Sequence, residues 1–311
     1  MTTPVDASTF GRRTEWEGDA SDTTGAPPTR DERADRAAAT ERYDAFLEGS
    51  PCHYACQPDD QVVRPALFRQ QDHDVHKIDE HDVMQNQLDD CFLMATLAGL
   101  ARTPEGRTVI ENAVKENKNE KGDVVSYTVT LHKPEKSYGG LGAKTFTPVA
   151  VTVDGHFVCG HAKARMDGNG SEVWPLVIER AFQEYKDRDY GMCNGDDKKG
   201  GPPMIAMELL TGKEAKQTPL WSLAGYRSYS AGRLQSDIDS GKIVVLDTKK
   251  QFEDSNPYAI INFHAYVVTG TENERGTLYV NLHNPYDSGD VRVPYNDLEN
   301  WFSSVDVGSV R

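Results

Sequence analysis

Residues 91–101, Cys-Phe-Leu-Met-Ala-Thr-Leu-Ala-Gly-Leu-Ala, contain no charged side chain and only one hydroxyl group. A helix of this composition has no polar face for water, so it must be buried on nearly all sides. Asp89 or Asp90 is a suitable N-cap residue, and the pattern therefore predicts a helix over 89–101. A chain of 311 residues with 37% hydrophobic side chains is long enough to build one or two cores around such a helix.

Charge and hydropathy exclude several classes of protein. The 34 Lys and Arg residues against 49 Asp and Glu residues give a net charge of -15, which repels phosphates and argues against a nucleic-acid partner. No stretch reaches the roughly 20 apolar residues of a membrane span, and the N-terminus lacks the apolar core of a secretory signal. Five sparse cysteines are typical of free thiols in a reducing compartment. We therefore expect a cytoplasmic protein, or one delivered by a specialised secretion system.

The sequence pattern divides the chain into three parts. Residues 1–50 are rich in charge and poor in large apolar side chains, and we expect a largely disordered acidic leader. Residues 51–212 mix helical and strand patterns, as in a helical domain with a small sheet. Strand patterns separated by Gly and Asn dominate residues 213–311. The predicted helices are 89–101, 105–117, 173–187 and 202–211, and the predicted strands are 124–132, 147–153, 242–248, 258–269, 277–283 and 291–294.

Cys91 follows the predicted N-cap, which is a suitable position for a nucleophile. Unpaired backbone N–H groups and the positive end of the helix dipole favour a thiolate in a first helical turn. The neighbouring Asp89 and Asp90 oppose this effect, so a cation such as a histidinium has to offset them. Buried cysteines are also common as inert core residues, and on this segment alone the two interpretations are equally good.

A predicted hairpin brings a histidine and an asparagine together. If residues 272–276 form a five-residue loop, the residue numbers of each cross-strand pair add up to 548. His264 then lies opposite Asn284. Directly opposed side chains have Cβ atoms about 5 Å apart, so the amide can orient the imidazole. Considered alone, His264 is best interpreted as a hydrogen-bonded core histidine, and Asn284 as a turn residue. Together with Cys91 and Gln85 they supply a base, an orienting amide, a nucleophile and an oxyanion donor.

Five motifs, in order along the chain, resemble those of calpain-type cysteine peptidases. Residues 85–100 are similar to their cysteine motif, in which a Gln lies six residues before the nucleophile. Residues 264–270 resemble their histidine motif and 284–286 their Asn-Pro-Trp, while 174–182 and 200–212 are similar to the intervening helices. The resemblance implies an α+β, two-lobed, papain-like fold. In this fold a helical lobe carries the catalytic Cys, and a β-sheet lobe carries the His and Asn.

The resemblance also assigns roles to residues. It implies a catalytic triad of Cys91, His264 and Asn284, with Gln85 in the oxyanion hole. The expected protein is an endopeptidase that hydrolyses protein substrates, needs no cofactor for the chemistry, and responds to an inhibitor or activator protein. Two alternatives stay open: acyl transfer to an amine, as in transglutaminase-like relatives, and a binding module with a silent cleft. A bacterial effector and an intracellular regulatory protease fit the sequence equally.

Three aromatic residues depart from the family pattern. Phe92 replaces a Trp, Phe263 replaces a frequent Gly, and Tyr286 replaces a Trp that shields the catalytic histidine. None of these replacements removes a catalytic atom. We expect all three side chains to line the cleft and to influence its subsites.

Two acidic residues are candidate calcium ligands. Asp82 and Glu172 match positions that supply carboxylates to a calcium site in calpain cores. Solvated acids in a very acidic chain explain both residues equally well. No Asp-x-Asp-x-Asp-Gly calcium loop occurs in the sequence.

A second group of residues offers softer metal ligands. A zinc site near the start of the core is one interpretation, whereas loose thiols and surface histidines are favoured by the irregular spacing. The residues are Cys52, His53, Cys56, His73, His76 and His81.

Overall fold

The computed structural model of the chain describes residues 62, 64–71, 74–135, 144–155, 157, 161–167, 170–190, 200–221, 227–252, 256–286 and 289–311. The expected acidic leader, residues 1–50, and the cysteines at 52, 56, 159 and 193 lie outside this part. Helices and strands are mixed along the described chain, which agrees with the expected α+β class.

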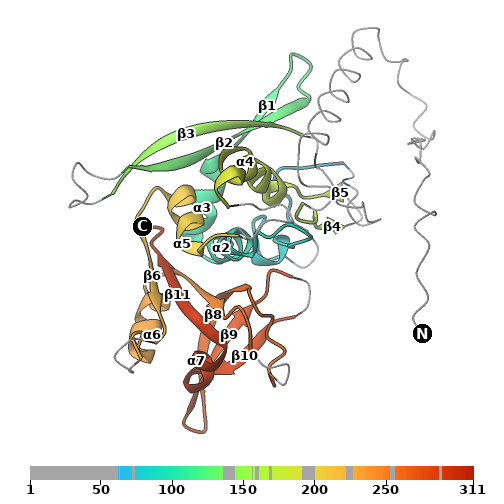
Figure 1. Cartoon of the computed structure of the whole chain (residues 1–311). Helices are drawn as coiled ribbons and strands as arrows, with labels where there is room; N and C mark the ends of the chain where they lie inside the picture. The colour runs from blue at the N-terminus through green and yellow to red at the C-terminus, as the bar shows by residue number, and fades with distance from the viewer. Residues whose placement is uncertain are drawn as a thin grey trace, which may run out of the picture. The chain divides into compact units, whose positions relative to one another are not determined.

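Helix α2 (Cys91–Ala101) is the centre of the first part, and every residue from Phe92 to Ala101 is buried. Figure 1 shows α2 together with α3 (Pro104–Ala113), α4 (Trp174–Tyr190) and α5 (Pro203–Thr211) between two sheets. The predicted helices at these four places are present, and three of them agree to within a few residues. In the described part of the chain, no helix is both long enough and apolar enough to cross a membrane.

The helix predicted over 105–117 is wrong in its last turn. Helix α3 ends at Ala113, and β1 (Val114–Lys118) pairs with β2 (Val124–Glu135) in an antiparallel ladder. Val114 is β-branched and has an extended backbone, with φ -116° and ψ 132°, which suits a strand better than a helix. Strand β3 (Thr145–Asp154) completes this sheet in the order β1-β2-β3. The predicted strands at 124–132 and 147–153 are confirmed.

A six-stranded antiparallel sheet contains most of the C-terminal part (Figure 1). Its strand order is β10-β9-β8-β7-β11-β6. The strands are β6 (Ala215–Pro219), β7 (Ile243–Thr248), β8 (Ala265–Glu274), β9 (Thr277–His283), β10 (Val291–Pro294) and β11 (Phe302–Gly308). The predicted strands at 242–248, 277–283 and 291–294 are confirmed, whereas β6, β11 and α6 (Ala231–Asp239) were not predicted. Smaller elements are β4 (Met166–Asp167), β5 (Gly170–Ser171), η2 (Glu80–Asp82), η4 (Tyr295–Asp297) and α7 (Leu298–Trp301).

Alternate residues of the central strands face two separate cores. Ile243 and Val245 of β7 lie in the core that contains α2, whereas Val244 and Leu246 lie in a second core on the far face of the sheet. This alternation follows from the two-residue period of a strand. Helix α2 is therefore covered by helices on one side and by β7 and β8 on the other.

The hairpin near His264 has a shorter loop than predicted. Strand β8 continues to Glu274 and β9 begins at Thr277, so the loop is the two-residue turn Arg275-Gly276. Both turn residues have positive φ, 51° and 85°, as a type I′ turn requires. Paired positions sum to 551 near the turn, as in Glu274 with Thr277, and to 550 beyond a bulge between 268 and 270. The predicted sum of 548 is wrong.

The strand predicted over 258–269 is also wrong in its first half, because β8 begins only at Ala265. The side chain of Asn256 accepts hydrogen bonds from the backbone N–H groups of Tyr258 and Ile260, at 3.1 and 2.9 Å. These bonds hold the segment in a loop, as side chains of Asn commonly do. The apolar run before the strand therefore packs as a loop, and this loop leads directly into His264.

Gly99 approaches β7 and β8 so closely that a side chain does not fit. A Cβ atom there would lie 2.6 Å from Cγ2 of Ile243 and 3.1 Å from Cγ2 of Val267. We expect Gly99→Ala to lower the free energy of unfolding by about 1–3 kcal/mol, the typical cost of overpacking a core, although Ala favours helix. The control is Gly232→Ala in α6, where an added Cβ has nothing within 4 Å. Urea denaturation should show the control as stable as the wild type or more so, and equal stability of the two variants would contradict the packing argument.

Candidate active site

A cavity of about 600 Å³ lies at the N-terminal end of α2, beside the six-stranded sheet. Its walls come from distant parts of the sequence, including the start of α2, the loop before β8, and the segments that follow β7 and β9. Of the residues to which the sequence assigned a role, those in the wall are Gln85, Cys91, Phe263, His264 and Tyr286. The fold therefore brings a thiol, an imidazole and an amide side chain into one cavity.

Cys91 is the first residue of α2 and is half-buried in the cavity wall. Burial raises the pKa of its thiol to about 12, and the carboxylates of Asp247 and Asp90 add to the increase. Hydrogen bonds to the sulfur from the backbone N–H groups of Ala265 and Phe92 lower this pKa. The helix start alone does not produce a thiolate here, because burial and two acidic neighbours outweigh it. These effects favour the neutral thiol of Cys91.

Asp90 occupies the N-cap position of α2, but its side chain makes no capping hydrogen bond. Its carboxyl is buried against that of Glu179 in α4, which accepts two hydrogen bonds from the backbone N–H of Ala162, at 2.9 and 3.0 Å. Burial raises the pKa of Asp90 to about 7. Burial and the charge of Asp90 raise the pKa of Glu179 well above its usual range. Both pKa shifts favour the neutral carboxyl, so burial limits the negative charge next to Cys91.

His264 is held by its backbone and by its ring. Its N–H donates to Oγ1 of Thr248 at 2.7 Å, and its carbonyl accepts from the N–H of Thr248 at 2.8 Å. Its Nε2 lies 2.8 Å from Oδ1 of Asn284, which also accepts the backbone N–H of Tyr286 at 3.0 Å. Because an amide oxygen only accepts, Nε2 carries the ring proton and Nδ1 is left with a free lone pair. The predicted contact between His264 and Asn284 is present, despite the different register.

The electrostatic environment keeps this histidine neutral. Burial lowers the pKa of His264 to about 4, and the hydrogen bond to Asn284 offsets only part of that decrease. The thiol pKa of Cys91 is shifted in the opposite direction. The two pKa shifts therefore favour a neutral thiol and a neutral imidazole over an ion pair.

Two of the three departing aromatic residues lie in the cavity wall. Tyr286 stacks on His264, with ring centroids 4.8 Å apart and planes at 14°, while Tyr266 meets the imidazole edge-on at 5.1 Å. Phe263 is 46% exposed and has φ 52°. This left-handed conformation favours glycine, which is the residue that the family resemblance leads one to expect there. Tyr286 thus covers one face of the imidazole.

The third aromatic residue, Phe92, was expected to line the cleft, and this expectation is wrong. Phe92 is only 1% exposed and packs edge-on against Phe182 of α4, with ring centroids 5.8 Å apart. Successive residues of a helix point about 100° apart. When Cys91 faces the cavity, the next side chain must therefore turn into the core.

Gln85 is anchored next to the Asn284 segment. Its backbone N–H donates to the carbonyl of Pro285 at 2.8 Å, and its side-chain Nε2 donates to the carbonyl of Leu88 at 2.9 Å. An amide nitrogen has two N–H groups, so one remains for a group in the cavity. The predicted oxyanion donor is thus fixed in place before any substrate is bound.

A pair of acidic residues beside the cavity was missed by the sequence analysis. Asp247 lies in the cavity wall, and the amide of Gln217 bridges it to Asp306 through hydrogen bonds of 3.3 and 3.2 Å. Burial and the charge of Asp306 raise the pKa of Asp247 well above its usual range. The sequence could have indicated Asp247, because it lies two residues after Val245 in the predicted strand. Residues two apart share one face of a strand, and Val245 packs in the core that contains α2.

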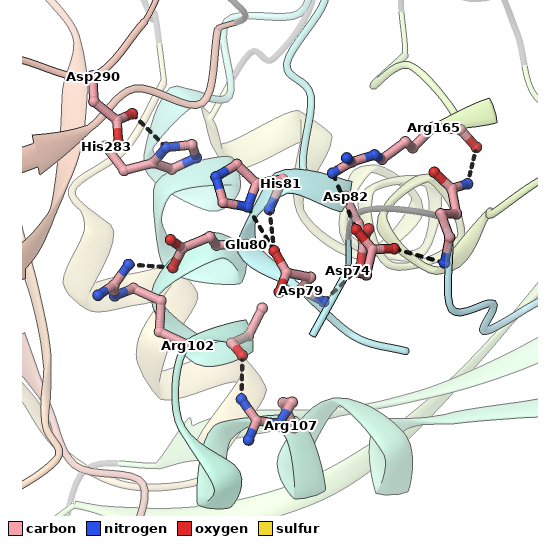
Figure 2. A network of polar contacts seen from close by, with 12 residues as sticks. Asp74, Asp79, Glu80, His81, Asp82, Arg102, Arg107, Arg165, His283 and Asp290 are labelled. Atoms are coloured by element: carbon pink, nitrogen blue, oxygen red, sulfur yellow. Dashed lines mark hydrogen bonds and ion pairs between the residues drawn. The ribbon is translucent and has the colours of Figure 1, made fainter. Parts of the chain in front are cut away.

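Three carboxylates gather beside η2, among them the two expected calcium ligands. Oxygen atoms of Asp74, Asp82 and Glu172 lie within 4.8 Å of one another. Each residue has one oxygen without a hydrogen bond, although Nη1 of Arg165 approaches Asp74 Oδ1 to 3.4 Å (Figure 2). Burial raises the pKa of Asp82 to about 7, and burial together with the charge of Asp82 raises that of Glu172 to about 9. Converging carboxylate oxygens of this kind suit a hard cation such as calcium.

The proposed zinc ligands of the sequence analysis are only partly described. Cys52, His53, Cys56 and His73 lie outside the described residues. Of the other two, His76 and His81 line different cavities, so the described members of the motif do not meet. His81 instead lies against His283, with ring centroids 5.6 Å apart.

The shifted pKa values predict how Cys91 reacts with iodoacetamide. With a thiol pKa of about 12 and a His264 pKa of about 4, the labelling rate should increase steadily from pH 6 to pH 10. A thiolate–imidazolium pair would instead give a plateau between the two pKa values. Asp247→Asn removes a charge that raises the thiol pKa, so the labelling rate of Cys91 in this variant should begin to increase at lower pH. Glu120→Gln, which removes an exposed charge outside the cavity, is the control. Mass spectrometry of Cys91 over time measures the rates, and a plateau in the wild type would contradict the neutral pair.

Comparison with known families places this geometry in a group of enzymes. Residues 57–308 match the calpain family cysteine protease, and this match covers most of the chain, including Gln85, Cys91, His264 and Asn284. A comparison with curated proteins found no match. On the strength of the family match, the chain belongs to the calpain family of cysteine proteases.

Proposed function

We propose that the chain is an active cysteine endopeptidase with a catalytic triad of Cys91, His264 and Asn284. The helices around α2 form one lobe of a papain-like fold and the six-stranded sheet forms the other, with the cavity as the substrate cleft. The observation that carries the proposal is the 2.8 Å hydrogen bond from His264 to Asn284, made beside a cavity that also contains Cys91. A histidine that serves only to fill a core need not line a cavity together with a thiol.

In the proposed mechanism the two neutral groups react together. As a substrate carbonyl approaches, Nδ1 of His264 takes the proton from Sγ of Cys91 and the sulfur attacks the carbonyl carbon. The imidazolium that forms is stabilised by Asn284, which keeps its hydrogen bond to Nε2. It then donates a proton to the leaving amine, which breaks the peptide bond. A water molecule, activated by the same Nδ1, releases the acyl group and restores the thiol.

The developing oxyanion needs donors that are already in position. The backbone N–H of Cys91 and the remaining N–H of the Gln85 amide supply them in this proposal. The hydrogen bonds from Gln85 to Pro285 and Leu88 fix the amide, so no reorganisation is needed during the reaction. Tyr286 shields the imidazole from water by stacking on it.

The carboxylate cluster supports a calcium site in the same proposal. Asp74, Asp82 and Glu172 would hold the ion through the three oxygen atoms that lack hydrogen bonds. Calcium would supply positive charge that relieves the repulsion among buried carboxylates and thereby stabilises this part of the fold. It takes no part in the peptide-bond chemistry.

Substitution of the triad tests the catalytic proposal. Cys91→Ala should abolish cleavage of fluorescently labelled casein, and His264→Ala should lower kcat/KM by at least about 100-fold, since the general base is lost. Asn284→Ala should retain measurable turnover, because the base remains and only its orientation suffers. Residual activity is measured together with the thermal unfolding midpoint of each variant, so that misfolding is recognised.

The matched control is His76→Ala, which changes an exposed histidine outside the cleft and should leave turnover unchanged. Cleavage that persisted in Cys91→Ala would contradict the proposal. Incorporation of a labelled amine without casein cleavage would instead favour acyl transfer. A wild-type protein inactive in both assays would favour a binding module.

A calcium titration tests the carboxylate cluster. At a concentration about 100-fold above the dissociation constant, calcium should raise the midpoint of thermal unfolding by about 5–10 °C. Glu172→Gln should lose this response and, without calcium, should be more stable than the wild type, because a neutral amide removes the cost of protonating this carboxylate on burial. Glu120→Gln, at an exposed position, is the control and should respond like the wild type. An equal calcium response in Glu172→Gln would contradict the site.

A further inference from the structure

Two histidines from different parts of the chain lie face to edge outside the catalytic cavity. His81 belongs to η2 and His283 is the last residue of β9. Their ring centroids are 5.6 Å apart and their planes are at 71°. Figure 2 shows the two rings side by side, each with a carboxylate on its outer side and its other nitrogen toward the neighbouring ring. Neither residue has a role in the proposed peptide-bond chemistry.

Each imidazole is held by its own carboxylate through Nδ1. The distance is 2.6 Å from His81 to Asp79 and 2.7 Å from His283 to Asp290. A carboxylate on Nδ1 keeps the proton there, so Nε2 presents a lone pair. Histidine ligands of metal ions are almost always oriented by this kind of outer hydrogen bond.

One of the two Nε2 atoms is buried and lacks a partner. Nε2 of His283 has no hydrogen-bond partner in the described structure, and the residue is only 7% exposed. A buried polar atom without a partner costs about 1–3 kcal/mol, so this atom indicates a ligand. The side chain of His81 is 58% exposed, and a cavity of about 570 Å³ lined by both histidines provides access.

The spacing of the rings suits a shared metal ion. A zinc ion about 2.0–2.1 Å from a ring nitrogen lies about 3 Å from the ring centre, so two imidazoles in tetrahedral coordination have centres about 5 Å apart. The observed separation is 5.6 Å, which small side-chain rotations can close. Asp79 and Asp290 contribute negative charge, whereas Lys163 and Arg165 of the same cavity oppose a cation. Arg165 is already paired with a carboxylate, Asp74.

We propose that His81 and His283 form a binding site for a transition-metal ion such as Zn²⁺, with water or an external ligand completing the coordination. Two protein ligands make this site weaker than a four-ligand structural zinc site, so it responds to changes in metal concentration. It differs from the zinc motif considered in the sequence, with which it shares only His81. It also differs from the carboxylate cluster, whose oxygen ligands suit calcium.

The location of this two-histidine site gives it a consequence for the catalytic cavity. His81 lies four residues before Gln85, and His283 directly precedes Asn284. The two segments already meet through the hydrogen bond from the Gln85 N–H to the Pro285 carbonyl. A bound ion would add a second connection between the segment of the oxyanion amide and the segment of the orienting asparagine.

Zinc titration by calorimetry at pH 7.5 tests the proposal. The protein is the full chain with Cys91→Ala and without a histidine tag, so that the catalytic thiol contributes nothing and the result does not depend on protease activity. We expect a binding event that weakens at least tenfold in His81→Ala and in His283→Gln. Asp290→Asn, at an exposed position, should weaken it by about 10–100-fold through the lost orientation of His283. His76→Ala is the matched control and should bind zinc like the parent.

Cobalt gives an independent readout of the ligands. The His81-dependent Co²⁺ spectrum should lack a thiolate charge-transfer band, since both protein ligands are nitrogen atoms. Zinc binding that is unchanged in His81→Ala would overturn the proposal. Binding that is lost only in Glu172→Gln would also overturn it, because the ion would then belong to the carboxylate cluster. Because His81 is exposed, its replacement is not expected to unfold the protein, and a thermal scan without metal verifies this.

Discussion

The packing of α2 against β7 and β8 fixes the position of Cys91, the proposed nucleophile. Gly99 lets the helix approach the sheet until a Cβ would lie 2.6 Å from a methyl group of Ile243. A helix buried on all sides cannot rotate without exposing apolar residues or burying polar ones. Its first residue, Cys91, is therefore held at the edge of the sheet that carries His264. The distance between the two lobes of the proposed fold is set by apolar packing rather than by the catalytic residues themselves.

The same burial determines the charge state of the site. Apolar surroundings disfavour both a thiolate at Cys91 and an imidazolium at His264, and the acidic neighbours Asp90 and Asp247 further disfavour the thiolate. The raised pKa values of Asp90 and Glu179 limit the negative charge next to Cys91. In such a site the ion pair need not exist before substrate binds. In the proposed mechanism it forms with the attack on the carbonyl, where the oxyanion donors offset the cost of separating charge.

Local signals in the sequence were sufficient for α2, for the strands β7, β9 and β10, and for the residues that meet in the cavity. The predictions were wrong where contacts between residues distant in the sequence determine the structure. The end of α3 was misplaced because Val114 gains more from pairing with β2 than from another helical turn. Phe92 was placed in the cleft by analogy, although the helical rotation after Cys91 turns it into the core. His283 showed no sign of a partner in η2, since nothing local to either segment encodes their contact.

The contact between His264 and Asn284 shows how a wrong register can still give a correct pair. Near the Arg275-Gly276 turn the paired positions sum to 551, and continuation of that register would place the two side chains on opposite faces of the sheet. The bulge between 268 and 270 changes the sum to 550. This differs from the predicted 548 by two residues, which is one full period of a strand, so the residues at the end of the ladder alternate between the two faces as predicted. His264 and Asn284 lie just beyond the last paired residues, where Nε2 and Oδ1 meet at 2.8 Å and the ring of Tyr286 stacks on the imidazole. Because the bulge restores the predicted alternation of faces, a register that was wrong by two residues still leads the two strands toward the observed pair of His264 and Asn284.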